Sequence, residues 1–354
     1  MSRPIRVLVV EDSPTVRARI VEVLRVDPQM FVVGECGDGK EAIEQCRLLR
    51  PDVVTLDMML PTLSGVAVTE HIMAYFPTPI VIVSSSTNRG ELHKTYDALA
   101  AGALAVLDKP SANDDGEAWA SELVSTVRIV SRLKVITHPR AKLFPAVPAA
   151  ASLLGPAAAV GASRDLIAIG ASTGGPAAVE TILSALPASF PIPILLVIHI
   201  AKDFGTAFAD WLGGQVRLPV REAVDGEPLP RPGTPGVIMA PPDLHLVVRD
   251  RRLRLTKDAP VFSCRPSVDM LFGSVAAELA RGALGMLLTG MGKDGAEGLL
   301  ALRTRGALTV AQDEATSVIF GMPREAILIG AAEHVLPLEQ MAPLLLSHVH
   351  GRHH

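Results

Sequence analysis

Ser172 stands in a glycine-rich stretch that follows a short apolar run, residues 166–169. The stretch reads Gly170-Ala171-Ser172-Thr173-Gly174-Gly175-Pro176. An apolar run that ends in glycines before a helical pattern, here residues 177–186, predicts a strand, a tight turn and a helix start. Such a turn exposes its serine beside helix N–H groups that can stabilise an oxyanion. The spacing fits the G-x-S-x-G pattern of nucleophilic serines, although a phosphate-binding turn looks the same.

A serine nucleophile needs a base and a group that orients the base. His199 directly follows the apolar run 194–198, and His245 opens a hairpin pattern. If the run 194–198 forms a strand parallel to and beside the strand before Ser172, the carboxyl ends of the two strands bring His199 next to the serine. His199 is therefore the preferred base.

Asp294 lies in a second glycine-rich loop, Gly290-Met291-Gly292-Lys293-Asp294-Gly295, after the apolar run 284–288. Glycines let the backbone approach a substrate closely, and N–H groups such as that of Met291 can then bind an oxyanion. Asp294 is placed to hold His199 in the tautomer that a base requires.

The resulting chain order, Ser172, His199 and Asp294, differs from the Ser-Asp-His order of α/β-hydrolases. That order would require a later histidine, His334. No glycine-marked loop and no strong apolar run precede His334, so the first assignment is favoured.

A second set of polar side chains follows apolar runs in the first 110 residues. Glu11 and Asp12 follow the first run, Asp57 the third, Ser84 the fourth and Lys109 the fifth. Because ligands bind at the carboxyl ends of strands in an open parallel sheet, we expect one pocket. Clustered carboxylates favour a cation, and hard oxygen ligands suit Mg²⁺. Lys109 supplies positive charge for a phosphate, and Asp57 can attack a phosphoryl group.

Apolar runs of strand length alternate with helical patterns throughout the chain, which predicts an α/β fold of two doubly wound domains, each with a parallel sheet between helices. The expected strands are residues 6–10, 31–36, 53–56, 80–83, 105–107, 166–169, 194–198, 237–239, 284–288 and 308–311, with a hairpin formed by residues 244–248 and 249–256.

The segment 137–163 separates the two halves. It contains nine Ala, four Pro and no acidic residue, and its prolines prevent one continuous helix. We interpret it as a linker between a domain of residues 1–136 and a domain of residues 164–346. The last residues, 347–354, contain four histidines and are interpreted as a flexible tail rather than a metal site.

Composition excludes several classes of function. The net charge of −4 gives no electrostatic footprint for nucleic acid or an anionic membrane. Three scattered cysteines fit a reducing compartment. The first apolar run ends at Glu11-Asp12, unlike a signal peptide, and no run approaches the length of a membrane span. We expect a cytoplasmic monomer with no nucleic-acid partner and no membrane insertion.

The polar set of the first half resembles the receiver domain of two-component response regulators, which has a flavodoxin-like fold. The resemblance covers residues 4 to about 130 and rests on Glu11-Asp12, Asp57, Ser84 and Lys109-Pro110. It implies that Asp57 accepts a phosphoryl group from a histidine kinase, with Mg²⁺ held by Asp12, Asp57 and the backbone carbonyl of Met59. One departure is Val106, at a position that is often aromatic in receivers.

The second half resembles the CheB family of chemotaxis protein-glutamate methylesterases from residue 165 to about 345. The matching motifs are residues 169–176, Ile198-His199, residues 240–245, residues 289–296, residues 311–314 and Gly321-Met322-Pro323. The resemblance implies a Ser-His-Asp hydrolase of γ-glutamyl methyl esters on chemoreceptors, often with glutamine deamidation and without a cofactor for hydrolysis. It also implies that Thr173, His199 and the Met291 backbone lie near the reacting carbonyl.

The resemblance further implies that the unphosphorylated receiver covers the cleft around Ser172 and that phosphorylation of Asp57 activates the enzyme. Two other functions compete with this one. A receiver fused to a DNA-binding output domain would need a helix-turn-helix and a basic face, which the second half lacks. A non-catalytic phosphate sink would not depend on Ser172.

Overall fold

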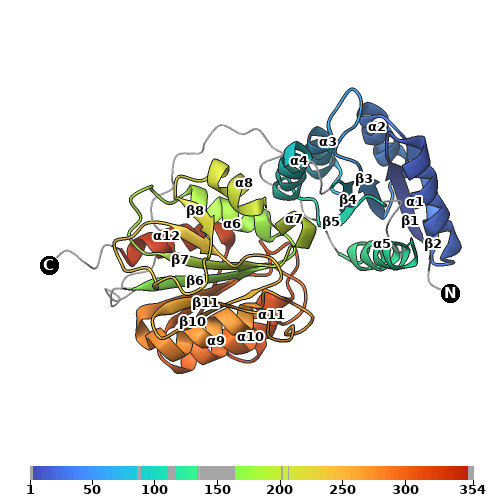
Figure 1. The fold of residues 1–354 in the computed structure, drawn as a ribbon. Coiled ribbons are helices and arrows are strands. Elements are labelled where there is room, and N and C mark those ends of the chain that lie inside the picture. Colours follow the sequence, from blue (N-terminus) through green and yellow to red (C-terminus); the bar gives the residue numbers. More distant parts are fainter. Residues whose placement is uncertain are drawn as a thin grey trace. The chain divides into compact units, whose positions relative to one another are not determined.

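The computed structural model describes residues 3–85, 89–110, 116–133, 135, 164–200, 202–205 and 207–349. The predicted linker, residues 137–163, and the tail from residue 350 onward lie outside the described residues. The chain divides into two compact units, Met1–Phe144 and Pro145–His354, and each has its own parallel sheet (Figure 1).

The first unit is a five-stranded parallel sheet with the strand order β2-β1-β3-β4-β5. Helix α1 packs against α5, and α3 packs between α2 and α4. Side-chain caps start several helices, such as Ser13 before α1 and Asp38 before α2. The elements are β1 (Ile5–Val10), α1 (Pro14–Val26), β2 (Met30–Cys36), α2 (Gly39–Leu49), β3 (Val53–Leu56), α3 (Gly65–Tyr75), β4 (Ile80–Ser84), α4 (Arg89–Ala100), β5 (Ala105–Asp108) and α5 (Gly116–Val130).

The second unit is a seven-stranded parallel sheet with the strand order β14-β13-β12-β6-β7-β9-β8, beside an antiparallel hairpin of β10 and β11. The elements are β6 (Leu166–Ala171), α6 (Gly175–Ser184), β7 (Ile194–Ile198), α7 (Lys202–Gly205), α8 (Phe208–Gln215), β8 (Val220–Glu222), β9 (Val237–Met239), β10 (His245–Arg249), β11 (Arg252–Thr256), α9 (Val268–Leu279), the 3₁₀ helix η2 (Ala280–Gly282), β12 (Ala283–Leu287), α10 (Ala296–Thr304), β13 (Leu308–Gln312), α11 (Met322–Leu328), β14 (His334–Leu336) and α12 (Leu338–Ser347).

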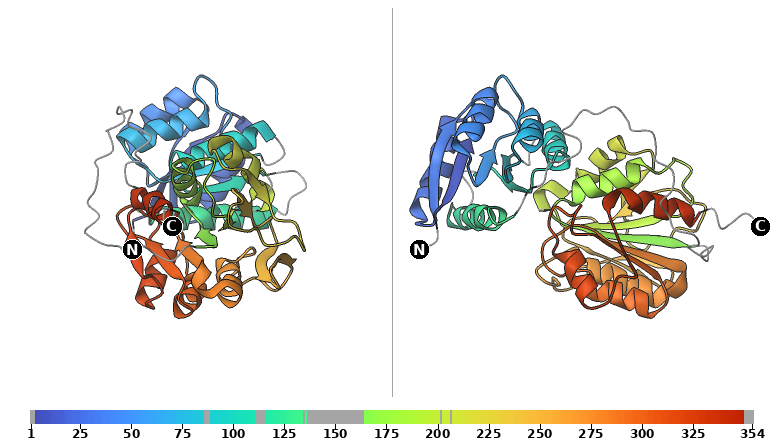
Figure 2. Two further views of the ribbon diagram at one scale, coloured as in Figure 1. Left: turned by 90° about the vertical axis from the view of Figure 1, so that its left-hand side faces the viewer. Right: turned by 180° about the vertical axis from the view of Figure 1, so that it is seen from behind.

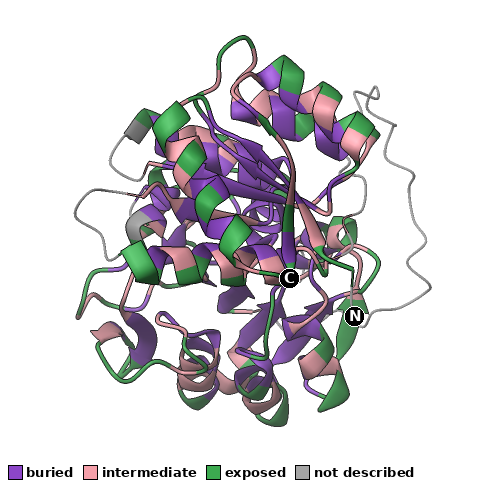
Figure 3. Ribbon diagram, turned by 90° about the vertical axis from the view of Figure 1, so that its right-hand side faces the viewer, coloured by how far each residue is buried: buried purple, intermediate pink, exposed green. Residues whose placement is uncertain are grey.

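Helices cover both faces of the seven-stranded sheet. Helices α6, α8 and α12 lie on one face, and α9, α10 and α11 lie on the other (Figure 2). Strands β6, β7 and β12 are buried along their whole length, and Figure 3 shows buried strands against exposed outer helix surfaces. The central strand of this sheet is β6, so the residue that follows β6 lies at the middle of the sheet edge where ligands bind in this class of fold.

The predicted fold class and strand pattern are confirmed. The hairpin has a two-residue turn, Asp250-Arg251, with φ angles of 53° and 57°, as a type I′ turn requires. Two strands were not predicted, β8 and β14, which form the two edges of the seven-stranded sheet. Each has only three residues and is partly exposed, so neither leaves a continuous apolar run in the sequence. Within the described residues, no helix is long and apolar enough to cross a membrane.

Candidate functional site

Ser172 is the first residue after β6. Its N–H donates to the carbonyl of Thr289 at 3.0 Å, and its carbonyl accepts from the N–H of Gly175 at 2.7 Å. Gly174 completes the turn with a φ of +77°, and a Cβ at this position would lie 2.6 Å from the Cβ of Val318. Because only glycine fits this conformation and this space, the turn holds Ser172 at the N-terminus of α6.

His199 follows β7, the strand that pairs with β6. Its N–H donates to the carbonyl of Ala171 at 3.0 Å, which places it beside Ser172 on the same sheet edge. Its Nε2 atom lies 2.9 Å from Oδ2 of Asp294. Because an ionised carboxylate only accepts hydrogen bonds, Nε2 carries the hydrogen, and the lone pair of the neutral ring is on Nδ1.

Asp294 is 2% exposed and lies against the start of α9. Its Oδ1 accepts from the Ser267 hydroxyl at 2.7 Å and from the Asp269 N–H at 3.1 Å, and its Oδ2 accepts from the Val268 N–H at 2.7 Å. Burial alone would raise the pKa of Asp294, but hydrogen bonds from His199, Ser267 and Val268 hold it below its ordinary value. The carboxylate is therefore ionised and fixed in place.

The pKa of His199 is governed by the same contacts. Burial alone would lower the pKa, but the hydrogen bonds with Asp294 and Cys264 outweigh burial and raise it to about 9. A partner of this kind is what a general base needs in order to become an imidazolium during a reaction.

Cys264 is the second partner of the His199 ring, with its Sγ atom 3.7 Å from Nδ1. It lies in the loop between β11 and α9 and is partly exposed. Sequence reasoning missed it because no strand ends at this position. The same loop leads to Ser267, which caps α9 through the Met270 N–H. A serine before an apolar helical pattern is a known start signal and could have identified the helix that holds Asp294.

The loop that contains Met291 lies against Ser172. A Cβ at Gly290 would lie 2.7 Å from the Ser172 Cβ and 2.3 Å from the sulfur of Met322, so only glycine permits this approach. Met291 itself is 48% exposed. The carbonyl of Thr173 accepts from the Thr289 hydroxyl at 3.0 Å, which connects the serine turn to the segment that follows β12.

The two other candidate histidines occupy different surroundings. His245 is fully buried, its Nδ1 accepts from the Ser267 N–H at 3.1 Å, and its Nε2 lies 3.3 Å from the carbonyl of Ala259. It therefore supports the start of α9. His334 opens the edge strand β14, three strands away from β6.

The polar set of the first unit also gathers at the carboxyl ends of its strands. Lys109 Nζ lies 2.9 Å from Oδ2 of Asp57 and 3.1 Å from Oε1 of Glu11. Both carboxylates are fully buried, and with the exposed Asp12 they offer oxygen atoms within 4.8 Å of one another. The Met59 N–H donates to Oδ1 of Asp57 at 3.2 Å. The five residues thus form one acidic pocket with a single lysine.

Within the described residues, the buried carboxylates of this pocket share one ion-pair partner, Lys109. Burial, and then the charge of Asp57, raise the pKa of Glu11 to about 7, and burial likewise raises the pKa of Asp57 despite its contact with Lys109. The Oε2 atom of Glu11 is buried and has no hydrogen-bond partner among the described residues. An uncompensated set of carboxylate oxygens fits Mg²⁺ and the waters it retains.

Ser84, the last residue of β4, is bound to helix α4. Its hydroxyl donates to Oε1 of Glu91 at 2.9 Å and accepts from the Thr95 hydroxyl at 3.0 Å. Sequence reasoning did not predict these two partners. Val106 lies in β5 opposite Ile82 of β4.

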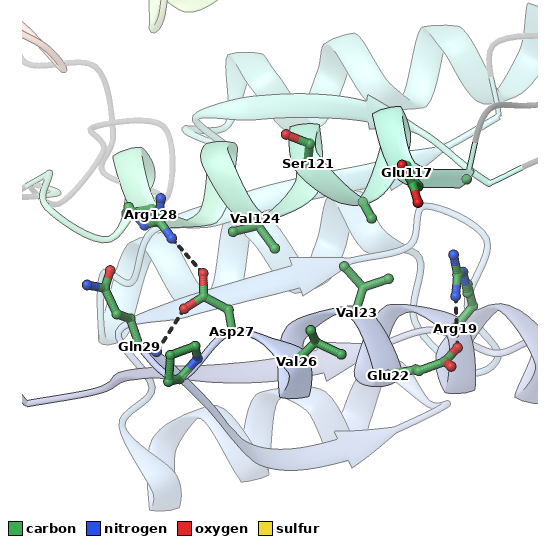
Figure 4. A pocket seen from close by; sticks show the side chains of 13 residues that line it. Arg19, Glu22, Val23, Val26, Asp27, Gln29, Glu117, Ser121, Val124 and Arg128 are labelled. Carbon is green, nitrogen blue, oxygen red and sulfur yellow. Dashed lines mark hydrogen bonds and ion pairs between the residues drawn. The ribbon is translucent and has the colours of Figure 1, made fainter.

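A groove between α1 and α5 of the first unit has a different character (Figure 4). Val23, Val26 and Val124 line its middle, and the ion pairs Arg128–Asp27 and Arg19–Glu22 lie at its ends. Each charged group there has a partner, so the lining offers no reactive cluster.

Fold and site together define a two-domain α/β hydrolase with a receiver domain. The family model of the CheB methylesterase matches residues 167–345, and that of the response regulator receiver domain matches residues 7–119. The chain belongs to the CheB methylesterase family, and the resemblance inferred from its motifs is confirmed.

Curated relatives match over nearly the full chain. The chain is 46% identical over 351 residues to a protein-glutamate methylesterase/protein-glutamine glutaminase of Nitrosospira multiformis, covering 98% of each chain. It is 44% identical to one from Syntrophus aciditrophicus, covering 97% of this chain and 98% of the relative. Among solved structures, the CheB methylesterase catalytic domain of Thermotoga maritima is 35% identical and covers 52% of this chain and 98% of its own, with a TM-score of 0.49.

Proposed function

We propose that this chain is a phosphorylation-activated hydrolase that removes methyl groups from glutamate γ-methyl esters on chemoreceptors and deamidates specific receptor glutamines. Family membership and the names of the full-length relatives support the two activities. The observation that carries the proposal is the position of His199, which lies beside Ser172 and hydrogen-bonds to Asp294.

In the proposed reaction, Ser172 Oγ attacks the γ-carbonyl carbon while His199 accepts its proton. Because Asp294 holds Nε2, Nδ1 is the ring nitrogen that takes this proton. The ionised Asp294 stabilises the imidazolium that forms. The backbone N–H of Met291 donates to the developing oxyanion, with Thr173 near the same carbonyl. No cofactor takes part in these steps.

Collapse of the tetrahedral intermediate breaks the bond to the methoxy group. His199 returns its proton to this group, which leaves as methanol, and the substrate is now an ester of Ser172. His199 then takes a proton from water, which attacks the acyl carbon. The bond to Ser172 Oγ breaks, His199 returns the proton to Oγ, and a glutamate side chain is released. The same steps with ammonia as the leaving group deamidate glutamine.

Asp57 is the proposed phosphoryl acceptor, with a histidine kinase as the donor. Asp12, Asp57 and the backbone carbonyl of Met59 would hold Mg²⁺, which neutralises charge on the phosphoryl oxygens when bound. Glu11 completes the acidic pocket, and Lys109 contacts the phosphoryl group. The Ser84 hydroxyl, which donates to Glu91 in the structure, donates to the phosphoryl group instead. The proposed domains are residues 1–136 and 164–346, joined by the linker 137–163.

Methanol release from a methylated receptor fragment tests the proposal. The full-length protein is assayed with and without acetyl phosphate, beside a Ser172→Ala variant whose folding is checked by circular dichroism. We expect methanol from the wild type, more of it after phosphorylation, and none above background from the variant. Equal rates from the wild type and a folded Ser172→Ala protein would exclude the proposed nucleophile.

A further inference from the structure

The ring of His199 and the thiol of Cys264 have the spacing of two ligands on one metal ion. In tetrahedral zinc sites the Zn–S distance is about 2.3 Å and the Zn–N distance is about 2.0 Å, which puts the two ligand atoms about 3.5 Å apart. The observed separation of Nδ1 and Sγ is 3.7 Å. A zinc ion therefore fits between these atoms with almost no movement of either side chain.

The other nitrogen of the ring is held as in histidines that bind metals. Such histidines commonly donate their second N–H to a carboxylate, which fixes the tautomer and makes the free nitrogen more basic. Nε2 of His199 donates to Asp294, and Asp294 is fixed in turn by Ser267 and Val268. His199, Cys264 and Asp294 each offer a ligand atom, and these atoms lie within 4.8 Å of one another. Because the Asp294 carboxylate already accepts hydrogen bonds from His199 and from the start of α9, it orients the histidine rather than binding the ion.

The loop that presents the thiol is also fixed. The backbones of Val261 and Cys264 exchange two hydrogen bonds, of 2.8 and 3.1 Å. The following residue, Arg265, donates twice to Oδ1 of Asp243, at 2.9 and 2.6 Å. The Sγ atom thus stays near the ring without help from a bound ion.

The other two cysteines of the chain are poor metal ligands. Cys36 and Cys46 are 4% and 1% exposed, and burial raises the pKa of their thiols to about 12 and about 11. Metals bind the thiolate. Of the three cysteines, only Cys264 therefore offers an accessible thiol to a thiophilic cation, and it belongs to the loop beside the proposed active site.

We propose that His199 Nδ1 and Cys264 Sγ bind a thiophilic divalent cation such as Zn²⁺, and that this binding switches the hydrolase off. Zn–N and Zn–S bonds form, the thiol and the protonated Nδ1 release their protons to solvent, and water fills the remaining positions. The bound ion occupies the lone pair that would accept the proton of Ser172. Binding itself is independent of the proposed function, whereas the inhibition rests on the proposed role of His199.

Cobalt, a spectroscopic substitute for zinc, tests the binding. Thiolate ligation gives Co²⁺ a charge-transfer absorption that oxygen and nitrogen ligands do not give. The parent protein for this test is the full-length chain with His350, His353 and His354 replaced by alanine, which removes other metal ligands of the tail. It is titrated with CoCl₂ in the presence of a phosphine reductant and excess Mg²⁺. We expect the absorption in the parent and in its Ser172→Ala variant, and no absorption in its Cys264→Ser variant. Failure of the parent to give the absorption, or its persistence in Cys264→Ser, would overturn the proposal.

Inhibition is read as a ratio of rates within each variant. Saturating ZnCl₂ should lower methanol release by the parent at least about tenfold, because a metal-bound imidazole cannot act as a base, and should change the rate of Cys264→Ser far less. Thiolate–cobalt absorption without zinc inhibition would contradict ligation by His199. A different result separates the two proposals. If the Ser172→Ala protein bound zinc and still released methanol, the metal site would be supported and the proposed function would be contradicted.

Discussion

The acidic pocket and the proposed active site both lie at the carboxyl ends of the strands of their sheets, but the two sites stabilise negative charge in opposite ways. In the pocket, burial raises the pKa of Asp57 and Glu11, and one lysine faces two buried carboxylates. At the active site, hydrogen bonds lower the pKa of the equally buried Asp294. In both sheets the carboxylates lie at the carboxyl ends of strands. Whether such a carboxylate needs a cation depends on how many hydrogen-bond donors the adjacent helix or loop supplies to it.

The neighbouring element at the active site is the start of α9. Two of its backbone N–H groups and its capping serine donate to Asp294, which satisfies the charge within the protein. The pocket has no comparable set of donors for Glu11, whose Oε2 lacks a partner among the described residues. We therefore expect chemistry at the pocket to depend on Mg²⁺ and chemistry at Ser172 to be independent of it.

Loss of the proposed nucleophile or of the proposed base should have the largest effect. Ser172→Ala or His199→Ala should lower kcat for methanol release by roughly 10⁴ to 10⁶, and Asp294→Asn by less, because the orienting acid can be partly replaced by the remaining contacts. Steady-state kinetics on folded variants measure this. A fall of less than tenfold for His199→Ala would remove His199 from the mechanism.

Phosphorylation should depend entirely on the acidic pocket. Incubation with acetyl phosphate and Mg²⁺ should add one phosphoryl group to the wild type and none to Asp57→Asn, as intact-mass spectrometry can measure. EDTA should abolish this labelling and the accompanying rise in methanol release while leaving the basal rate unchanged. If EDTA also lowered the basal rate of methanol release, chemistry at Ser172 would depend on a metal ion, contrary to the expected difference between the two sites.

Closing the gap beside Ser172 should have an intermediate effect. A methyl group at Gly290 would collide with Ser172 and Met322, and a displacement of about 1 Å at a nucleophile can cost on the order of 10²-fold in rate. Gly290→Ala should therefore lower kcat by about 10- to 100-fold. Gly273→Ala is the matched control, since its added methyl group on α9 meets no atom within 4 Å. Equal losses in both variants would point to folding rather than to the position of Ser172.

The smallest effect concerns pH. Because the pKa of His199 is raised to about 9, the neutral base becomes more abundant as pH rises, and kcat/KM should increase toward pH 9. The stability that the His199–Asp294 pair contributes runs the other way: it is fully present below the ordinary histidine pKa and is lost as pH rises through about 9. Cys264→Ala removes one cause of the raised pKa of His199, so the rise of kcat/KM with pH should occur at lower pH in this variant. If the rise occurred at the same pH in both proteins, Cys264 would not affect the pKa of His199.

Much of this architecture could be predicted from the sequence. The strands before Ser172 and His199 are continuous apolar runs, and parallel pairing of adjacent strands brings their ends together. The edge strands β8 and β14 could not be predicted, since three partly exposed residues carry little pattern. Cys264 and Ser267 follow no strand, and Glu91 contacts Ser84 from the first turn of α4. Only tertiary packing brings these residues to the sites, so spacing in the chain does not reveal them.

The proposed mechanism is tested most directly by locating the reactive serine chemically. Full-length wild type and His199→Ala proteins are treated with a serine-directed fluorophosphonate, and the adduct is located by peptide mass spectrometry. We expect an adduct on Ser172 of the wild type and a greatly slowed reaction in His199→Ala, because activation of the hydroxyl needs the base. An adduct on another residue, or labelling of Ser172 at the same rate in both proteins, would contradict it.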